Sequence, residues 1–166
     1  MAAYPLLFVF PLLMLYAATM DVLTMRIANL LSIGLVVAFV VVAPIAGMPG
    51  TQMLMHLGIG VAALVVCMVL FQLRFVGGGD AKLLAAASLW VGYEQFAPFI
   101  IWVTVFGGLL AVLMLAYRNM PATALPLPDW ALRLHVSGTG IPYGVAITGG
   151  ALMVYPATGI PQLLGS

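Results

Sequence analysis

Two of the four acidic residues, Asp21 and Asp80, stand where a pair of carboxyl groups could do chemistry. Asp21 ends the first long apolar stretch, and Asp80 opens a later one directly after three glycines. Two carboxyl groups about 3 Å apart do not both ionise, so one keeps a proton while the other is ionised. The ionised group can take a proton from water, and the protonated group can donate to a carbonyl oxygen. Such a pair predicts peptide-bond hydrolysis without a covalent intermediate.

Each of these acids also has a structural interpretation. Asp80 could cap the helix that follows the glycines, because an aspartate side chain accepts hydrogen bonds from free N–H groups at a helix start. Asp21 could simply terminate the first apolar stretch, with Arg26 as an exposed partner. The remaining acids, Glu94 and Asp129, are expected to be an ordinary interfacial residue and a loop residue. Only the pair, if the fold brings it together, favours catalysis.

Other catalytic machinery is missing from the sequence. It contains no G-x-S-x-G elbow and no H-E-x-x-H helix. The two histidines, His56 and His135, are far apart, and Cys67 is the only cysteine. A lone cysteine excludes an intrachain disulfide and a cysteine-based zinc site. We therefore expect neither a metal nor another cofactor.

The composition requires a membrane. Hydrophobic residues make up 65% of the 166 positions, charged residues 5%, and the mean hydropathy is +1.24. Soluble domains carry about 25% charged residues, so this chain could not cover a surface facing water. The length suits one membrane domain, residues 1–166, and the net charge of +1 offers no basic surface for nucleic acid. The expected fold class is an all-α polytopic helix bundle.

Six apolar stretches are expected to form about six transmembrane helices. They cover residues 4–20, 27–47, 53–73, 81–91, 96–117 and 141–158. A span needs about 20 residues, so the fourth stretch is short and could be partly re-entrant. The first stretch follows no basic region and lacks a convincing cleavage site, so it is interpreted as a retained helix. A polar, proline-rich loop is predicted over residues 118–140.

The basic residues predict the orientation of these helices. All five fall on one side of the six-span arrangement: Arg26, Arg74, Lys82, Arg118 and Arg133. Cytoplasmic loops carry the excess of lysine and arginine, so this side is expected to be cytoplasmic and both termini outside. Asp21 and Asp80 lie at span ends on this same side. The charge pattern therefore predicts that both acids lie at one membrane depth.

Three segments resemble a known family, the type IV prepilin peptidases, which are intramembrane aspartyl proteases of the GxGD kind. Residues 77–84 (GGGDAKLL) resemble the family's G-x-G-D-x-K-L segment. Residues 21–30 (DVLTMRIANL) resemble its first-aspartate segment, D-x(4)-R-I-P-N-x-L, with Ala28 where the family usually has proline. Residues 141–147 (IPYGVAI) resemble its P-Y-G-V-A-I segment. The short length resembles the CpaA/TadV type, which serves tight-adherence (Flp) pili.

The resemblance implies a function and a set of site residues. It implies that Asp21 and Asp80 are the catalytic pair of a metal-independent endopeptidase. This enzyme would cut the leader from pilin-like precursors at the cytoplasmic face of the bacterial inner membrane, without N-methylation of the product. The precursor would carry a short basic leader followed by an apolar helix. The residues expected to shape the site are Gly77, Gly78, Gly79, Lys82, Pro142 and Tyr143.

These shaping residues have individual expected roles. Gly77 and Gly79 would let the substrate helix unwind near the acids. Lys82 would anchor the interface or bias the charge of Asp80. Pro142 and Tyr143 would open the last span beside the site, with the tyrosine hydroxyl available as a donor.

Two other functions remain open on the sequence. One is a non-enzymatic membrane scaffold or transport component whose acids only cap helices. The other is a different GxGD-type aspartyl protease, of the presenilin or signal-peptide-peptidase kind. The short chain and the place of Asp21 at the end of the first span argue against the second. The substrate pilin and the oligomeric state are not predicted.

Overall fold

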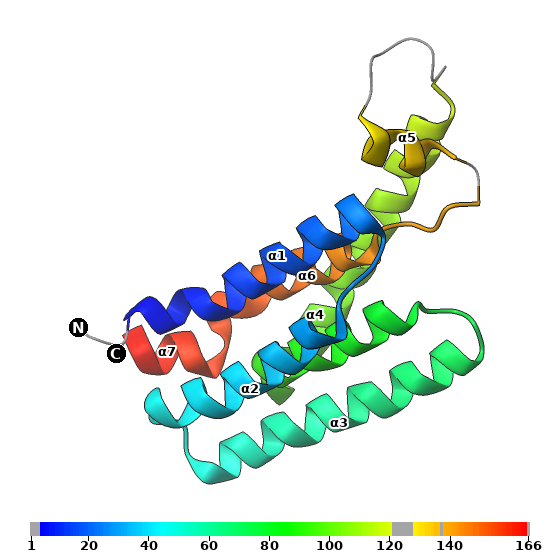
Figure 1. Cartoon of the computed structure of the whole chain (residues 1–166). Helices are drawn as coiled ribbons and strands as arrows, with labels where there is room; N and C mark the ends of the chain where they lie inside the picture. Colours follow the sequence, from blue (N-terminus) through cyan, green and yellow to red (C-terminus); the bar gives the residue numbers. More distant parts are fainter. Residues whose placement is uncertain (1–3, 121–127, 137, 166) are drawn as a thin grey trace.

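A computed structural model describes residues 4–120, 128–136 and 138–165, and every regular element in these ranges is a helix. The elements are η1 (Tyr4–Phe8), α1 (Val9–Thr24), α2 (Asn29–Ile45), α3 (Gly50–Gln72), α4 (Gly78–Arg118), α5 (Asp129–His135), α6 (Tyr143–Val154), η3 (Tyr155–Ala157) and α7 (Gly159–Gly165). Figure 1 shows them as a bundle with α4 at its centre, in contact with α3, α2 and α6. The prediction of an all-α membrane helix bundle is confirmed.

Helix α4 is two helices joined at one residue. Gly92 interrupts the helical backbone with φ 75° and ψ 177°. The part before Gly92 runs away from Asp80, and the part after it returns toward the start of α6, where Gly107 lies against Tyr143. This first part, which ends at Val91, is the short fourth span of the prediction. The predicted loop over residues 92–95 shrinks to Gly92, since Tyr93 is already helical.

His56 of α3 packs against this break. Its Nδ1 lies 2.8 Å from the carbonyl oxygen of Leu89, and its ring stacks on Phe39 of α2. A Cβ atom at position 92 would overlap the imidazole ring. The buried histidine thus has a structural role: it hydrogen-bonds to a carbonyl oxygen near the end of the first part of α4, where the break interrupts the helix.

Replacing Gly92 by alanine is expected to destabilise the bundle. The backbone conformation at Gly92 is essentially restricted to glycine and costs other residues about 1–3 kcal/mol, and the added methyl group also overlaps His56. Thermal unfolding in detergent should therefore show a clearly lower Tm for Gly92→Ala. Gly58→Ala on α3 is the matched control, because nothing lies within 4 Å of its Cβ position. Equal Tm values for the two variants would contradict this role.

The described part of the chain contains six apolar helical segments where the prediction has spans: η1 with α1, α2, α3, the two parts of α4, and α6 with η3. By length and composition alone, three helical stretches can cross a membrane: Tyr4–Thr24, Gly50–Gln72 and Gly78–Arg118. Helix α2 is apolar but shorter than a full span. Helix α4 is one of the three stretches, although the break at Gly92 divides it into two helices. The sixth segment, α6 with η3, is shorter still. Segments with few residues need protein neighbours at their ends, and α6 has them in α1 and α4.

The remaining boundaries differ modestly from the predicted ones. Helix α1 continues past Asp21 to Thr24, so Asp21 lies in the last turn of the helix. Helix α5 forms within the predicted proline-rich loop. Residues 121–127 and 137 of that loop lie outside the described residues, as do residues 1–3 of the predicted retained N-terminal segment.

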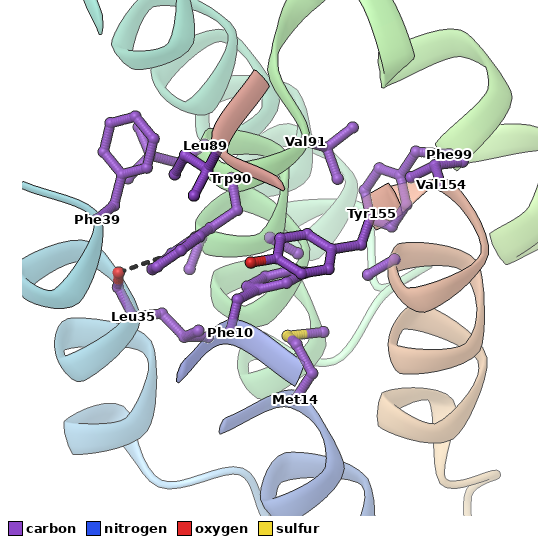
Figure 2. Packing of buried hydrophobic residues seen from close by; sticks show 14 of the residues in the cluster. Phe10, Met14, Leu35, Phe39, Leu89, Trp90, Val91, Phe99, Val154 and Tyr155 are labelled. Carbon is purple, nitrogen blue, oxygen red and sulfur yellow. Dashed lines mark hydrogen bonds between the residues drawn. The ribbon is translucent and has the colours of Figure 1, made fainter. Parts of the chain in front are cut away.

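An aromatic core fixes α1 against α4 (Figure 2). Phe10 of α1 stacks on Trp90 with ring centroids 5.0 Å apart and also contacts Tyr155. The indole Nε1 of Trp90 donates to the carbonyl oxygen of Leu35 on α2 at 2.9 Å. The hydroxyl of Tyr155 donates to the carbonyl oxygen of Leu7 at 3.0 Å. The polar groups of both rings are thereby satisfied, as burial in a dry interior requires.

This core also sets the depth of the two acids. Asp21 follows Phe10 by about three turns, or roughly 16 Å along α1. Asp80 precedes Trp90 by about 15 Å along α4. Because Phe10 and Trp90 stack on each other and both acids lie in the same direction from them, the two carboxyl groups end at nearly equal depth.

Candidate active site

Asp21 is buried and held by the start of α6. Its side chain is 5% exposed in the last turn of α1. The backbone N–H of Gly144 donates to Asp21 Oδ2 at 2.7 Å. This N–H belongs to the first turn of α6, where backbone donors lack partners inside the helix. A free N–H group at a helix start is therefore satisfied by the carboxyl group.

The approach of α6 to Asp21 depends on glycine at position 144. A Cβ atom there would lie 2.8 Å from Asp21 Oδ2 and 3.1 Å from its Cβ. Real Cβ atoms do not come so close to other heavy atoms, so any larger residue must displace the carboxyl group or the helix. The sequence did suggest that the segment 141–147 lies beside the site, but it did not single out this glycine.

Asp80 lies in the first turn of α4 and is partly buried. The N-cap residue is Gly77, and no side chain makes a cap hydrogen bond there. The helix-capping alternative for Asp80 is therefore not what the structure shows. Its carboxyl group turns back over Gly77, where a Cβ atom would be 2.8 Å from Oδ2.

The three glycines before Asp80 provide space. None of them has a positive φ. A Cβ at Gly78 would lie 3.2 Å from the ring of Phe71, and one at Gly79 would lie 3.2 Å from Ile27 Cβ. The glycines thus let α4 begin in close contact with both the end of α3 and the segment before α2.

Both acids line one cavity of about 490 Å³. Its lining comes from three parts of the chain: the end of α1 with the residues after it, the glycine segment, and the irregular segment before α6. The residues are Asp21, Met25, Arg26, Ile27, Gly77, Gly78, Gly79, Asp80, Thr139, Gly140 and Ile141. A cavity of this size can admit an extended peptide segment between two acids.

Three residues predicted to shape the site do not line this cavity. Lys82 is exposed on the other side of α4, where its Nζ donates to Asn29 Oδ1 at 2.8 Å. Pro142 is the buried N-cap residue of α6. Tyr143 packs against Gly107, whose Cβ position is 3.0 Å from the tyrosine hydroxyl. They position the elements around the acids, and the tyrosine hydroxyl faces α4.

The sequence missed the residues that hold the cavity wall formed by residues 139–141. Arg118, the last residue of α4, donates from Nη2 to the carbonyl oxygens of Thr139 at 2.5 Å and Gly140 at 3.0 Å. Its Nε donates to the carbonyl oxygen of Leu134 on α5 at 3.0 Å. Arg133 of α5 donates to the carbonyl oxygen of Leu23. The guanidinium groups of Arg118 and Arg133 therefore connect α5 and this wall to α4 and α1. The positions of the basic residues in the sequence did not predict these contacts.

Replacing Arg118 by glutamine is expected to loosen this wall and slow any reaction in the cavity. Three carbonyl contacts are lost while both acids stay in place, so we expect a loss in kcat/KM of roughly tenfold, below the effect of moving a catalytic group. Cleavage assays with purified variants would measure it. Arg74→Gln, which removes one charge from an exposed residue at the same end of the bundle, is the control. Full activity of Arg118→Gln would show that the wall needs no such tie.

The fold and this cavity define an all-α membrane helix bundle in which two aspartates line one cavity. The comparisons with known proteins narrow that class of protein further. A sequence model of the type IV leader peptidase family matches residues 8–112, so the chain belongs to that family. The matched residues include both aspartates and the glycine segment, while residues 141–147 lie beyond them. Searches of the curated proteins and of the solved structures found no match.

Proposed function

We propose that the chain is a prepilin leader peptidase that uses Asp21 and Asp80 as an aspartyl catalytic pair. The observation that carries the proposal is that both carboxyl groups line one cavity at one end of the bundle, in a member of the type IV leader peptidase family. A shared proton requires the two carboxyl groups to approach each other, and their place in one cavity supports this. Metal ions are not needed for this chemistry.

In the proposed reaction, the scissile carbonyl carbon lies between the two carboxyl groups. The ionised group takes a proton from a water molecule, which attacks that carbon while the protonated group donates to the carbonyl oxygen. The group that received the proton then donates it to the amide nitrogen as the C–N bond breaks, and the other carboxylate takes back a proton from a hydroxyl of the intermediate. The Gly144 N–H keeps Asp21 Oδ2 in place during these transfers. The glycine segment leaves room for an unwound peptide, since each of its members borders the cavity.

The proposed substrate is a pilin-like precursor of the tight-adherence (Flp) type, with a basic leader and an apolar helix. Arg118 and Arg133 hydrogen-bond to chain segments around the cavity, so both basic residues lie at this end of the bundle. Because basic residues are enriched on the cytoplasmic side of membrane proteins, this supports a cytoplasmic location for the cavity. The bacterial inner membrane is the proposed site of action. The leader then lies in the cytoplasm and the apolar helix continues into the lipid.

The proposal is tested with the purified protein in lipid vesicles and a full-length Flp-type precursor. We expect a single cut between leader and apolar helix, with the same rate in the presence of EDTA because the acid pair needs no metal. Mass spectrometry of the mature product gives the cut site and shows whether its new N-terminus carries a methyl group, which we do not expect. Absence of cleavage, or its loss in EDTA, would overturn the proposal in favour of a scaffold or of a metal-dependent mechanism.

A further inference from the structure

A second, larger hollow lies on the other side of α4. The proposed reaction at Asp21 and Asp80 gives this hollow no function. It has a volume of about 540 Å³ and an almost wholly apolar lining. Residues of α2 and α3 form its sides and residues of the first part of α4 form its floor. Its lining residues are Asn29, Ser32, Ile33, Val36, Val37, Leu57, Gly60, Val61, Leu64, Lys82, Ala85, Ala86 and Leu89. We call it the α2–α3 groove.

The groove has the shape that a membrane helix needs. Gly60, Ala85 and Ala86 are small, and small residues let helix backbones approach closely in lipid. The side residues are larger and exposed, among them Val37 at 56% and Val61 at 60%. From Lys82 to Leu89 the floor extends about 11 Å, which is two turns of a helix. An apolar helix laid along it would contact α2, α3 and α4 together.

Ser32 is a polar residue in the lining of the groove, and its hydroxyl group lacks a hydrogen-bond partner among the described residues. Its side chain is 8% exposed. A buried hydroxyl group without a partner costs free energy. In membranes, serine hydroxyls commonly bond to a polar group on an adjacent helix. The Oγ atom itself has almost no exposed surface, so a rotation about χ1 is needed to bring it to the groove. There a polar group on a docked helix would satisfy it, whereas a hydrocarbon chain of a lipid would not.

One end of the groove lies near the cavity that contains Asp21 and Asp80, although the two share no lining residue. Asn29 and Lys82, joined by their 2.8 Å hydrogen bond, lie at this end. Asn29 comes two residues after Ile27, and Lys82 two residues after Asp80; Ile27 and Asp80 both line the cavity. A chain leaving the acids can therefore pass over this polar pair into the groove.

We propose that the α2–α3 groove binds the apolar helix of the precursor, directly after the bond that is cut. This inference rests on the proposed leader-peptidase function and adds the surface that recognises the substrate. The groove orients the helix so that its N-terminal end meets Asp21 and Asp80. Lys82, predicted to anchor the interface, is then a contact for the start of that helix.

A neighbouring hollow serves as the internal comparison. It lies between α3 and the second part of α4, has a volume of about 410 Å³, and is lined by residues such as Ala62, Cys67 and Phe96. It includes no residue of α2 and neither member of the polar pair. Its one hydroxyl, on Thr104, already donates to the carbonyl oxygen of Ile100. It therefore lacks the features that indicate a docked helix.

Disulfide crosslinking in membranes distinguishes the two surfaces. The full-length chain carries Cys67→Ala, to remove the native thiol, and Asp80→Asn, to leave the precursor uncut. Single cysteines are then placed at the adjacent positions Val61 and Ala62, which line the α2–α3 groove and the neighbouring hollow respectively. The precursor has one cysteine, moved through the first two turns of its apolar helix. We expect a crosslinked precursor with Val61→Cys and none with Ala62→Cys.

Every other pattern overturns the inference. Crosslinking at Ala62→Cys instead would place the helix in the neighbouring hollow. A disulfide between two copies of the Val61→Cys chain, without precursor, would make the groove a homodimer surface. No crosslink at either position would leave the groove to lipid. Since the precursor stays uncut, binding is measured independently of cleavage, and failure of the wild-type chain to cleave would count only against the proposed function.

A filled groove provides the kinetic test. With both aspartates intact, Val61→Trp is expected to raise KM for the full precursor by roughly tenfold, because a bulky side chain occupies the docking surface. Ala62→Trp adds the same bulk one residue away and should leave KM within error of wild type. Equal KM values for wild type and Val61→Trp would contradict the inference.

Discussion

Replacing either Asp21 or Asp80 by asparagine is expected to lower the rate of leader cleavage by roughly 10²–10⁴-fold, the range found for a lost general acid or base. Asparagine has nearly the size of aspartate but can neither ionise nor lend a proton to the pair. The two carboxyl groups line one cavity, so loss of either leaves no acid–base pair there. Cleavage of a reconstituted precursor, followed by mass spectrometry, measures the effect.

The asparagine variants also separate catalysis from structure. No side chain caps the start of α4, so Asp80→Asn should keep the Tm of the wild-type protein in detergent. Asp21→Asn still offers an oxygen to the Gly144 N–H and should also fold. A non-enzymatic scaffold whose acids only cap helices would tolerate both substitutions, because asparagine keeps the size of aspartate and can still cap a helix. Full processing by either one would exclude the proposed pair.

Replacing Gly144 by alanine should lower cleavage by roughly 10²-fold, the loss that a misplacement of about 1 Å can cause. The new methyl group would stand 2.8 Å from Asp21 Oδ2, so the carboxyl group must move and its 2.7 Å hydrogen bond must break. Backbone strain is not the cause, because Gly144 is helical and does not have a positive φ. The kcat of the purified variant is the quantity to measure.

Gly108→Ala is the matched control for that variant. Gly108 is also helical, and nothing lies within 4 Å of its Cβ position. It makes the same chemical change without touching Asp21, and the better helix propensity of alanine favours folding. We expect normal kcat for Gly108→Ala. Normal kcat for Gly144→Ala as well would show that the position of Asp21 is not held by the start of α6.

The sequence predicted the helix bundle, and it predicted the common depth of the acids. Apolar stretches of span length leave few alternatives to helices in lipid, so the all-α class followed from composition. The one-sided basic residues put Asp21 and Asp80 at the same end, and the cavity contains both. The resemblance to prepilin peptidases is confirmed by the family match over residues 8–112. The Flp-type substrate and the catalytic roles stay predictions.

The features that could not be predicted depend on contacts between distant segments. The hydrogen bond from Gly144 to Asp21 joins α6 to α1, and no spacing along the chain indicates it. The hydrogen bonds from Arg118 to residues 139 and 140 could not be predicted either, because the sequence around a basic residue at the end of an apolar stretch does not indicate its partner. Lys82 was placed near the acids by its sequence distance from Asp80, but helical periodicity turns it to the opposite side, toward Asn29.

A comparison of Asp21→Asn, Asp80→Asn and the double variant tests the central claim most directly. Groups that act as one unit lose most of their effect when the first is removed, so their losses do not multiply. If the two acids share one proton and one reaction, the double variant should cleave the precursor no more slowly than the slower single variant, within error. Losses that multiply, or a single variant with wild-type cleavage, would contradict catalysis by the Asp21–Asp80 pair.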